Sequence, residues 1–156
     1  MILYLFYQTG IRLSELIGIK DVDVRNGELK VLGKRNKERI IPLSNIIQPL
    51  IDQYLNLKDE LGFKKKYFFV TDNGNKLYEK FVYRKVNYYL SIVSSKQKKS
   101  PHILRHTFAT HMLNNGADLN SIKEILGHEN LSATQVYTHN TFQKLKSIHK
   151  QSHPRG

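Results

Sequence analysis

The side chains best suited to chemistry on a phosphate lie mainly on one predicted helix near position 105. Arg105 lies three residues after His102, so the two side chains stand one turn apart on neighbouring faces. An apolar stripe on the same helix indicates that it is well buried, and a buried guanidinium needs an anionic partner. No acidic residue lies within the helix, so a bound phosphate or a distant Asp or Glu must supply that partner. By angle His106 is as well placed as His102. The stripe consists of Leu104, Phe108 and Met112.

Two further basic residues occupy positions from which a charge could act on a ligand. Arg12 begins a predicted helix just after the break at Gly10, and Glu15 lies three residues on, so a surface ion pair is the alternative interpretation. Lys34 lies at the charged tip of a predicted β-hairpin, where a solvated lysine is the ordinary interpretation. Spacing alone decides neither case.

A third group of candidates lies near the C-terminus. Gly127 ends a predicted helix, His128 follows it in the turn, and Tyr137 comes nine residues later in a short predicted helix. Taken singly, His128 is typical of a polar turn and Tyr137 is typical of a packed core. These residues gain weight only in combination with the others.

The elements that must hold these residues are mostly helical. Residues 1–8 are apolar on every side, which predicts a buried helix end or a buried strand. Ser44, Ser100 and Asp118 are predicted helix N-caps. The pattern predicts an α+β fold: a mostly helical domain with a small three-stranded antiparallel sheet. Helices are predicted over 11–18, 44–60, 78–92, 100–115, 118–127, 132–138 and 141–150, and strands over 28–33, 39–43 and 64–71.

Composition narrows the class of partner. The chain has 156 residues with 25 Lys and Arg against 13 Asp and Glu, a formal net charge of +12, which favours a polyanion or serves solubility alone. It has no cysteine, which excludes a disulfide scaffold and a thiolate nucleophile. No apolar run is long enough to span a bilayer, and none reads as a cleaved signal peptide. His102 and His106 do not predict a zinc site, because Ile103 stands where the metallopeptidase pattern needs Glu.

Four stretches taken together resemble the tyrosine recombinase (phage-type integrase) family, and most closely its Xer-like bacterial members. They cover almost the whole chain in order, and the tail His149-Lys-Gln-Ser-His-Pro-Arg155 is also Xer-like. The stretches are Thr9-Gly-Ile-Arg-Leu-Ser-Glu-Leu16, Leu32-Gly-Lys-Arg-Asn-Lys-Glu-Arg-Ile-Ile-Pro-Leu43, Pro101-His-Ile-Leu-Arg-His-Thr-Phe-Ala-Thr-His111 and Leu126-Gly-His-Glu-Asn-Leu-Ser-Ala-Thr-Gln-Val-Tyr-Thr-His139.

The resemblance implies the fold of a tyrosine recombinase catalytic domain and the family reaction, in which DNA strands are cleaved and rejoined through a 3′-phosphotyrosine. It implies that no metal and no cofactor take part. Fixed guanidinium donors suit the extra charge of a five-coordinate phosphorus, and a positioned lysine suits protonation of the leaving oxygen. The catalytic set that the resemblance implies is Arg12, Lys34, His102, Arg105, His128 and Tyr137.

The resemblance also implies partners and boundaries. Residues 1–156 are expected to form the C-terminal catalytic domain, shortened at its front and without the N-terminal DNA-clamping domain. The expected partners are double-stranded DNA, further copies of the chain in a tetramer on DNA, and accessory recombination proteins, with a monomer free in solution. The segment 141–150 is expected to dock on a neighbouring protomer in that assembly. The expected location is the cytoplasm, at the nucleoid, with no membrane contact.

Two other functions remain as alternatives. Residues 118–139 hold two short helices around a glycine-containing turn, which also fits a non-catalytic helix-turn-helix DNA-binding module. Such a module would give no reason for Arg12, Lys34 and Tyr137 to occur together. A type IB topoisomerase uses similar chemistry, but the Xer-like tail argues against it.

Overall fold

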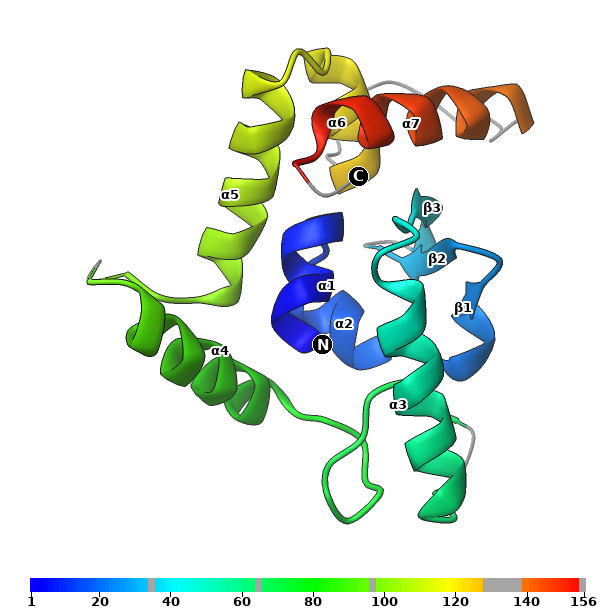
Figure 1. The fold of residues 1–156 in the computed structure, drawn as a ribbon, viewed down its shortest axis with the longest axis vertical. Coiled ribbons are helices and arrows are strands. Elements are labelled where there is room, and N and C mark those ends of the chain that lie inside the picture. The colour runs from blue at the N-terminus through cyan, green and yellow to red at the C-terminus, as the bar shows by residue number, and fades with distance from the viewer. Residues whose placement is uncertain (34–35, 64–65, 96–97, 128–138, 155–156) are drawn as a thin grey trace.

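The structure is a computed structural model that describes residues 1–33, 36–63, 66–95, 98–127 and 139–154 (Figure 1). Seven helices and three strands, with a short 3-10 turn at Asp21–Asp23, make up the described part. The elements in order are α1 (Ile2–Thr9), α2 (Leu13–Gly18), β1 (Val24–Arg25), β2 (Glu28–Leu32), β3 (Glu38–Pro42), α3 (Gln48–Glu60), α4 (Glu79–Val93), α5 (Pro101–Asn114), α6 (Leu119–Leu126) and α7 (His139–Ser152).

Helix α1 lies at the centre of the molecule, with α5 packed beside it (Figure 1). Residues 2–8 therefore belong to a helix that is partly buried at its start and more deeply buried toward its end, in agreement with the predicted buried helix end. It ends at Gly10, whose φ of 60° is in the left-handed region and whose N–H donates to the Phe6 carbonyl. A Cβ at Gly10 would lie 2.6 Å from the Phe108 ring and 2.7 Å from Leu126, so only glycine fits there.

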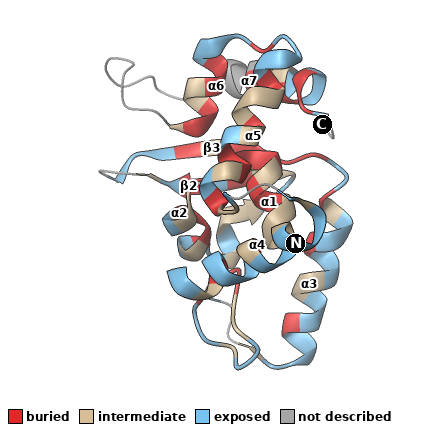
Figure 2. Cartoon of the chain, turned by 90° about the vertical axis from the view of Figure 1, so that its left-hand side faces the viewer, coloured by how far each residue is buried: buried red, intermediate tan, exposed pale blue. Residues whose placement is uncertain are grey.

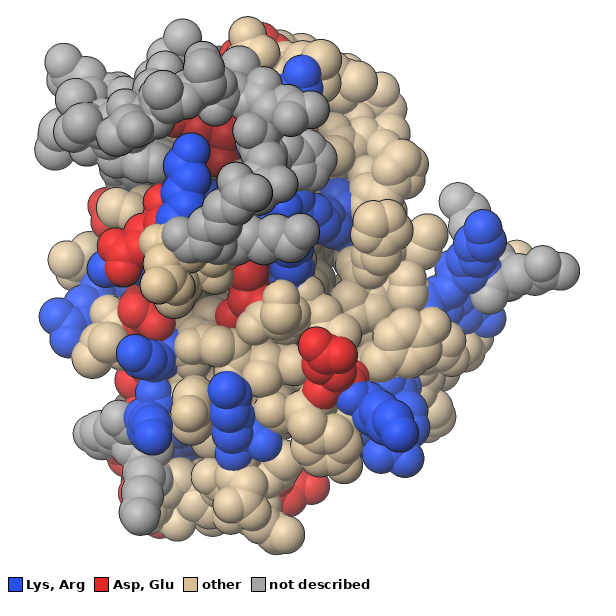
Figure 3. All heavy atoms as spheres, turned by 180° about the vertical axis from the view of Figure 1, so that it is seen from behind, with Lys and Arg blue, Asp and Glu red and all other residues tan. Residues whose placement is uncertain are grey.

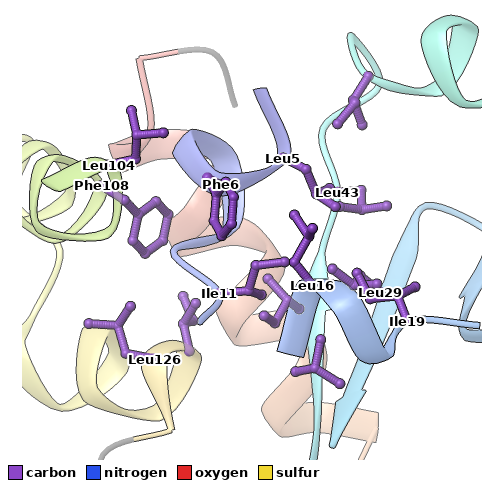
Figure 4. Close-up of a cluster of buried hydrophobic side chains, with 14 of the residues drawn as sticks. Leu5, Phe6, Ile11, Leu16, Ile19, Leu29, Leu43, Leu104, Phe108 and Leu126 are labelled. Carbon is purple, nitrogen blue, oxygen red and sulfur yellow. The ribbon is translucent and has the colours of Figure 1, made fainter. Parts of the chain in front are cut away.

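The core forms where these helices meet the sheet. Phe6 of α1, Phe108 of α5 and Leu126 of α6 converge next to the Gly10 turn (Figure 4). On the other side of α1, Leu16 of α2 and Leu29 of β2 extend the same cluster. Buried residues gather at this centre, whereas α3 and α4 are exposed along most of their length (Figure 2).

The sheet has the order β1-β2-β3 and is antiparallel throughout. The predicted hairpin of β2 and β3 is confirmed, with Val31 opposite Arg39 and a turn closed by the Gly33 N–H on the Lys37 carbonyl at 2.8 Å. The prediction that 64–71 forms the third strand is wrong, because β1 takes that place and, within the described part of that segment, only the isolated bridges Lys20–Tyr67 and Val70–Lys76 occur.

The reason for that difference lies in a buried lysine. Lys58 of α3 is 2% exposed and donates its Nζ hydrogens to the carbonyl oxygens of Tyr67 and Phe68 and to Asp21. Phe68 and Phe69 are adjacent in sequence and both buried, and their ring centroids lie 4.9 Å apart, so these side chains do not point to opposite faces as in a strand. The segment thus packs under α3 as irregular chain.

Helix starts follow the predicted caps with one exception. Asp118 caps α6 by accepting from the Ser121 N–H at 2.9 Å, and Ser100 stands at the N-cap of α5. The exception is Ser44, which does not cap the next helix because α3 begins at Gln48. The Ser44 hydroxyl instead accepts from the Gln8 side-chain amide at 2.9 Å and so ties that loop to α1. The predicted helix 132–138 lies outside the described residues.

Helix α7 packs against β3, α5 and α6 of its own chain. Leu145 is 2% exposed, and the ring nitrogen Nε2 of His149 donates to the Gln8 carbonyl at 2.8 Å. Burial lowers the pKa of His149, against a smaller opposing effect of that hydrogen bond. His153 stacks on His149 with 5.0 Å between ring centroids and contacts the Tyr7 carbonyl at 3.1 Å. The C-terminal half of α7 is therefore seated on the end of α1.

None of the helices in the described part of the chain is both long enough and apolar enough to cross a membrane.

Replacing Phe108 with alanine is expected to lower the free energy of unfolding by about 3–5 kcal/mol, because the ring is fully buried between α1, α6 and α7. The matched control is Leu113→Ala on the same helix, which is 51% exposed and should change stability by about 0.5 kcal/mol or less. Urea denaturation followed by circular dichroism measures both. Equal losses in the two variants would contradict the placement of the core.

Candidate active site

Arg105 is held at the meeting point of two helix ends. The side chain is buried, as predicted, and the residue is 8% exposed. Its Nη1 donates to the Gly10 carbonyl at 2.5 Å and its Nη2 to the Leu126 carbonyl at 2.9 Å. Its hydrogen-bond partners in the described structure are therefore backbone carbonyls at the ends of α1 and α6, so no distant Asp or Glu hydrogen-bonds it there. Carbonyl oxygens satisfy N–H donors without cancelling the positive charge, which stays available to an anion.

Arg12 lies at the start of α2 and combines backbone and side-chain contacts to one carboxylate. Its N–H donates to Glu15 Oε2 at 2.7 Å, and its Nη1 donates to Glu15 Oε1 at 2.9 Å. The predicted pairing of Arg12 with Glu15 is confirmed, but it is not a surface pair, because the Glu15 side chain is only 3% exposed. The Arg12 side chain is 33% exposed and also donates from Nη2 to the Gly127 carbonyl at 3.0 Å.

Glu15 forms a second and deeper ion pair with Arg39 of β3. Nη1 and Nη2 of Arg39 donate to the two carboxylate oxygens at 2.8 and 2.9 Å, with both side chains almost completely buried. Burial by itself raises the pKa of Glu15, but the hydrogen bonds and charge of Arg39, followed by the donors of Arg12, outweigh it and lower the pKa to about 2. Glu15 is therefore a carboxylate at any physiological pH.

Sequence reasoning did not identify Arg39. A signal was available, because Arg39 and Ile41 are two residues apart on one strand and so face the same side of the sheet. Ile41 is fully buried, and Arg39 is 4% exposed. An arginine at an inward position of a short strand needs a buried acceptor, and Glu15 is that acceptor.

The C-terminal end of α6 accepts a hydrogen bond from each of three arginines. Its last carbonyls lack partners within the helix, and they lie at the negative end of the helix dipole. The Ile125 carbonyl accepts from Arg39 Nε at 2.7 Å, and the next two carbonyls, of Leu126 and Gly127, accept from Arg105 and Arg12. Three consecutive carbonyls therefore bring together three side chains from α2, β3 and α5.

Gly127 makes this convergence possible. Its φ of 65° is left-handed, which ends α6. A Cβ at this position would lie 3.1 Å from Arg39 Nη1 and 3.2 Å from Arg39 Cδ. The guanidinium of Arg39 thus lies directly against the backbone at the end of the helix.

The described site carries more positive than negative charge. Three guanidinium groups face one carboxylate, since Arg12, Arg39 and Glu15 all influence the pKa of Arg105. Burial lowers the pKa of Arg105 first, and the charge of Arg12 adds to this, to about 10. Arg105 stays protonated at neutral pH, and the excess charge suits an anion with several oxygens. Lys and Arg also gather at several places on the face shown in Figure 3, with acidic residues between them.

The predicted site residues divide into two groups. Arg12 and Arg105 are brought together by Gly127 and Leu126, whereas His102 is exposed one turn before Arg105 on α5. His106 is exposed as well, so exposure does not separate the two histidines. Within the described ranges no three His, Asp or Glu side chains form a group that could hold a metal ion. Lys34, His128 and Tyr137 lie outside the described residues.

The chain neighbours of two of these residues do lie at the arginines. Gly33 immediately precedes Lys34, and a Cβ on it would lie 3.5 Å from Arg39 Nη1 and 3.6 Å from Glu15 Oε1. Gly127 immediately precedes His128 and lies against the same guanidinium. The two glycines that precede Lys34 and His128 therefore both lie next to the Arg39–Glu15 ion pair.

Comparison with known proteins gives a consistent result. The model of the phage integrase family matches residues 1–144. Tyrosine recombinase XerC of Chlorobaculum parvum is 45% identical over 98% of the chain, and XerC of Staphylococcus carnosus is 45% identical over all of it. XerD of Proteus mirabilis is 40% identical over 99%. The matches cover 48%, 54% and 51% of these proteins, so the chain spans about half their length.

Solved structures agree with the fold. XerA recombinase superimposes with a TM-score of 0.75 at 30% identity, covering 97% of this chain and 57% of that one. XerH bound to its difH substrate in a pre-cleavage complex gives a TM-score of 0.73 at 24% identity, covering 96% and 41%. A lambda integrase tetramer bound to a Holliday junction gives 0.58 at 20%, covering 86% and 43%, and shows likeness of fold. The predicted α+β catalytic fold is confirmed.

The Glu15 carboxylate predicts a specific acid sensitivity. Its pKa is about 2 in the folded chain against an ordinary value of 4.5, so its contribution to stability is complete above pH 4.5 and is lost as the pH falls toward 2. The difference corresponds to about 3 kcal/mol. In urea denaturation across this pH range, the free energy of unfolding of the native chain should fall, and that of Glu15→Gln should fall by less. Glu60→Gln, an exposed carboxylate on α3, is the control and should keep the native profile. Parallel profiles for the native chain and Glu15→Gln would contradict the buried pair.

Proposed function

The chain belongs to the phage integrase family, and on that premise we propose that it is the catalytic domain of a site-specific tyrosine recombinase. The observation that carries the proposal is the pair Arg12 and Arg105, fixed side by side on the carbonyl end of α6 with their charge only partly balanced. Two guanidinium groups held in this way suit the two non-bridging oxygens of one phosphate.

The substrate of this proposal is double-stranded DNA. The formal charge of +12 supports it, because cations that neutralise phosphates release counterions from the duplex. Similar structures are described as XerH bound to difH and lambda integrase bound to a Holliday junction or to a core site. A protein acting on chromosomal DNA would be found at the nucleoid.

The reaction is a reversible transesterification at phosphorus. The Tyr137 oxygen attacks the scissile phosphorus, a phosphotyrosine bond forms at the 3′ end, and the bond to the 5′ oxygen breaks. The phenol loses its proton and the leaving 5′ oxygen gains one, so charge and atoms balance. A 5′-hydroxyl attacking the phosphotyrosine reverses the step and rejoins the strand. Because one phosphate ester replaces another, no external energy source is needed.

Each residue has a role that follows from its charge. Arg12 and Arg105 stabilise the extra negative charge on the non-bridging oxygens in the transition state. Lys34 is the general acid for the 5′ oxygen. His128 donates a further hydrogen bond to the phosphate, and His102 accepts the phenol proton or donates to the phosphate. A free tyrosine has a pKa of about 10, and nearby cations lower the cost of its ionisation.

The exposed side of α4 extends the basic surface beside this site. Lys80 and Arg84 are exposed there and line a shallow hollow together with Tyr83, Leu13 and one acidic residue, Glu79. Leu13 follows Arg12 directly in the chain, so one residue that lines the hollow is the sequence neighbour of a site arginine. The DNA backbone leaving the scissile phosphate would run along α4.

The proposed active form is an oligomer on DNA, in line with the tetramer and dimer described for lambda integrase. In the single chain α7 is docked on its own β3, α5 and α6. Docking of residues 141–150 on a neighbouring protomer remains a prediction. Accessory recombination proteins remain part of the proposal as well.

The nucleophile is tested with a nicked DNA substrate that loses the short leaving strand and so traps the covalent intermediate. The native chain should give a protein–DNA adduct on a denaturing gel, and Tyr137→Phe should give none. The control is Tyr88→Phe on α4, whose side chain is 62% exposed and which should react like the native chain. Binding without any adduct would favour the helix-turn-helix alternative, and relaxation of plasmid supercoils without site preference would favour a topoisomerase.

The α4 surface is tested by the salt dependence of DNA binding. The double variant Lys80→Ala, Arg84→Ala should bind more weakly, and its slope of log K against log salt should fall by about 2, close to 0.9 for each lost phosphate contact. Lys146→Ala, Lys150→Ala removes two exposed lysines of α7 and is the matched control. Fluorescence anisotropy at several salt concentrations gives both slopes. Equal slopes for the two double variants would exclude α4 from the interface.

A further inference from the structure

We propose that Arg39 is a positioning residue of this site: it makes no contact with DNA itself, and it sets the places of the two phosphate-binding arginines. This inference rests on the proposed recombinase function. Arg39 lies within the second of the four family stretches, but it has no role in the catalytic set or in the proposed reaction.

All three nitrogens of the Arg39 guanidinium are engaged inside the protein. Nη1 and Nη2 contact the two oxygens of Glu15, and Nε contacts the Ile125 carbonyl. The residue is 4% exposed, so no face of it is open to a substrate. Any effect of Arg39 on the reaction must therefore pass through its neighbours.

Those neighbours are the acceptors that hold Arg12 and Arg105. Glu15, fixed by Arg39, accepts both the backbone N–H and the Nη1 of Arg12. The Ile125 carbonyl, also fixed by Arg39, is followed by the Leu126 and Gly127 carbonyls that hold Arg105 and Arg12. The Arg39 guanidinium thus supports both described acceptors of the Arg12 side chain, which are Glu15 and the Gly127 carbonyl. It also supports the Leu126 carbonyl, one of the two carbonyls that accept from Arg105.

The backbone around Arg39 leaves it little freedom. A Cβ added at Gly127 would lie 3.1 Å from Arg39 Nη1, and a Cβ added at Gly33 would lie 3.5 Å from the same nitrogen. These glycines lead directly into His128 and Lys34 in the sequence. A shift of the guanidinium would therefore displace the backbone at the start of both segments.

Lysine at position 39 would separate charge from position. It keeps the positive charge beside Glu15, so the electrostatic balance of the site is unchanged. Its single ammonium cannot reproduce the planar fork that spans two carboxylate oxygens and the Ile125 carbonyl at once. A misplacement of about 1 Å at a reacting group can reduce a rate about 100-fold.

The experiment compares Arg39→Lys with Arg25→Lys, a matched change at an exposed arginine of β1 in the same sheet. Each variant is checked for a cooperative thermal transition above the assay temperature. Adduct formation on the nicked substrate is then followed in single turnover over a range of DNA concentrations. We expect Arg39→Lys to reach half-saturation at a similar DNA concentration and to have a limiting rate about 100-fold lower. Arg25→Lys should match the native chain.

A second substrate distinguishes misplaced arginines from a damaged fold. Replacing one non-bridging oxygen of the scissile phosphate by a methyl group removes the negative charge that Arg12 and Arg105 serve. The loss caused by Arg12→Ala should shrink on this methylphosphonate, and the loss caused by Arg39→Lys should shrink with it by about tenfold or more. A variant that merely lowers the folded fraction loses the same factor on both substrates.

The outcomes separate the inference from the function on which it rests. If the native chain forms a Tyr137-dependent adduct and Arg39→Lys reacts at the native rate, the positioning role is wrong while the recombinase proposal stands. An equal loss on both substrates also overturns the positioning role. If the native chain forms no adduct at all, the proposed function fails and takes this inference with it. A lower limiting rate that recovers on the methylphosphonate supports it.

Discussion

A single buried carboxylate, that of Glu15, makes the arrangement of this site possible. Like charges brought together inside a protein are costly unless each is paired or hydrogen-bonded. The two oxygens of Glu15 accept hydrogen bonds from the Arg39 guanidinium, and they also accept from the backbone N–H and the side chain of Arg12. Without it, the described site would hold three guanidinium groups facing only carbonyl oxygens.

The end of α6 supplies the remaining stabilisation. Helix ends usually satisfy their last carbonyls with water, a following turn or a basic side chain. Here three successive carbonyls are each used by a different arginine, from three different elements. Carbonyls stabilise cations without cancelling their charge, so each of the three guanidinium groups is hydrogen-bonded and the site still attracts an anion. This combination is what a site for a phosphate with developing charge requires.

The three arginines differ in how far their side chains are exposed to solvent. Arg39 and Arg105 are almost completely enclosed, whereas a third of the Arg12 side chain is exposed. His102 is exposed on the helix that carries Arg105. The open side of the site therefore lies toward Arg12 and the start of α5, and its rigid side lies toward β3 and α6.

Much of this arrangement was predictable from sequence because the local signals are strong. Gly10, Gly127, Asp118 and Pro101 mark helix ends, and the buried character of Arg105 followed from the apolar stripe beside it. The resemblance to the family identified Arg12 and Arg105 as partners, which spacing alone could not. The predictions that were wrong depended on contacts between segments that are far apart in the sequence. Lys58 prevents the predicted third strand, and a hydrogen bond to Gln8 removes Ser44 from its predicted cap. The role of Arg39 could not be predicted from local sequence because its partner, Glu15, lies 24 residues away.

The position of α7 connects the end of the chain to this site. α7 packs on β3, α5 and α6, which are the elements that carry Arg39, Arg105 and the row of three carbonyls. Leu145 and His149 of α7 are buried, so α7 packs firmly against the elements that carry the arginines. A helix in this place cannot leave its own chain without exposing the elements that hold the site.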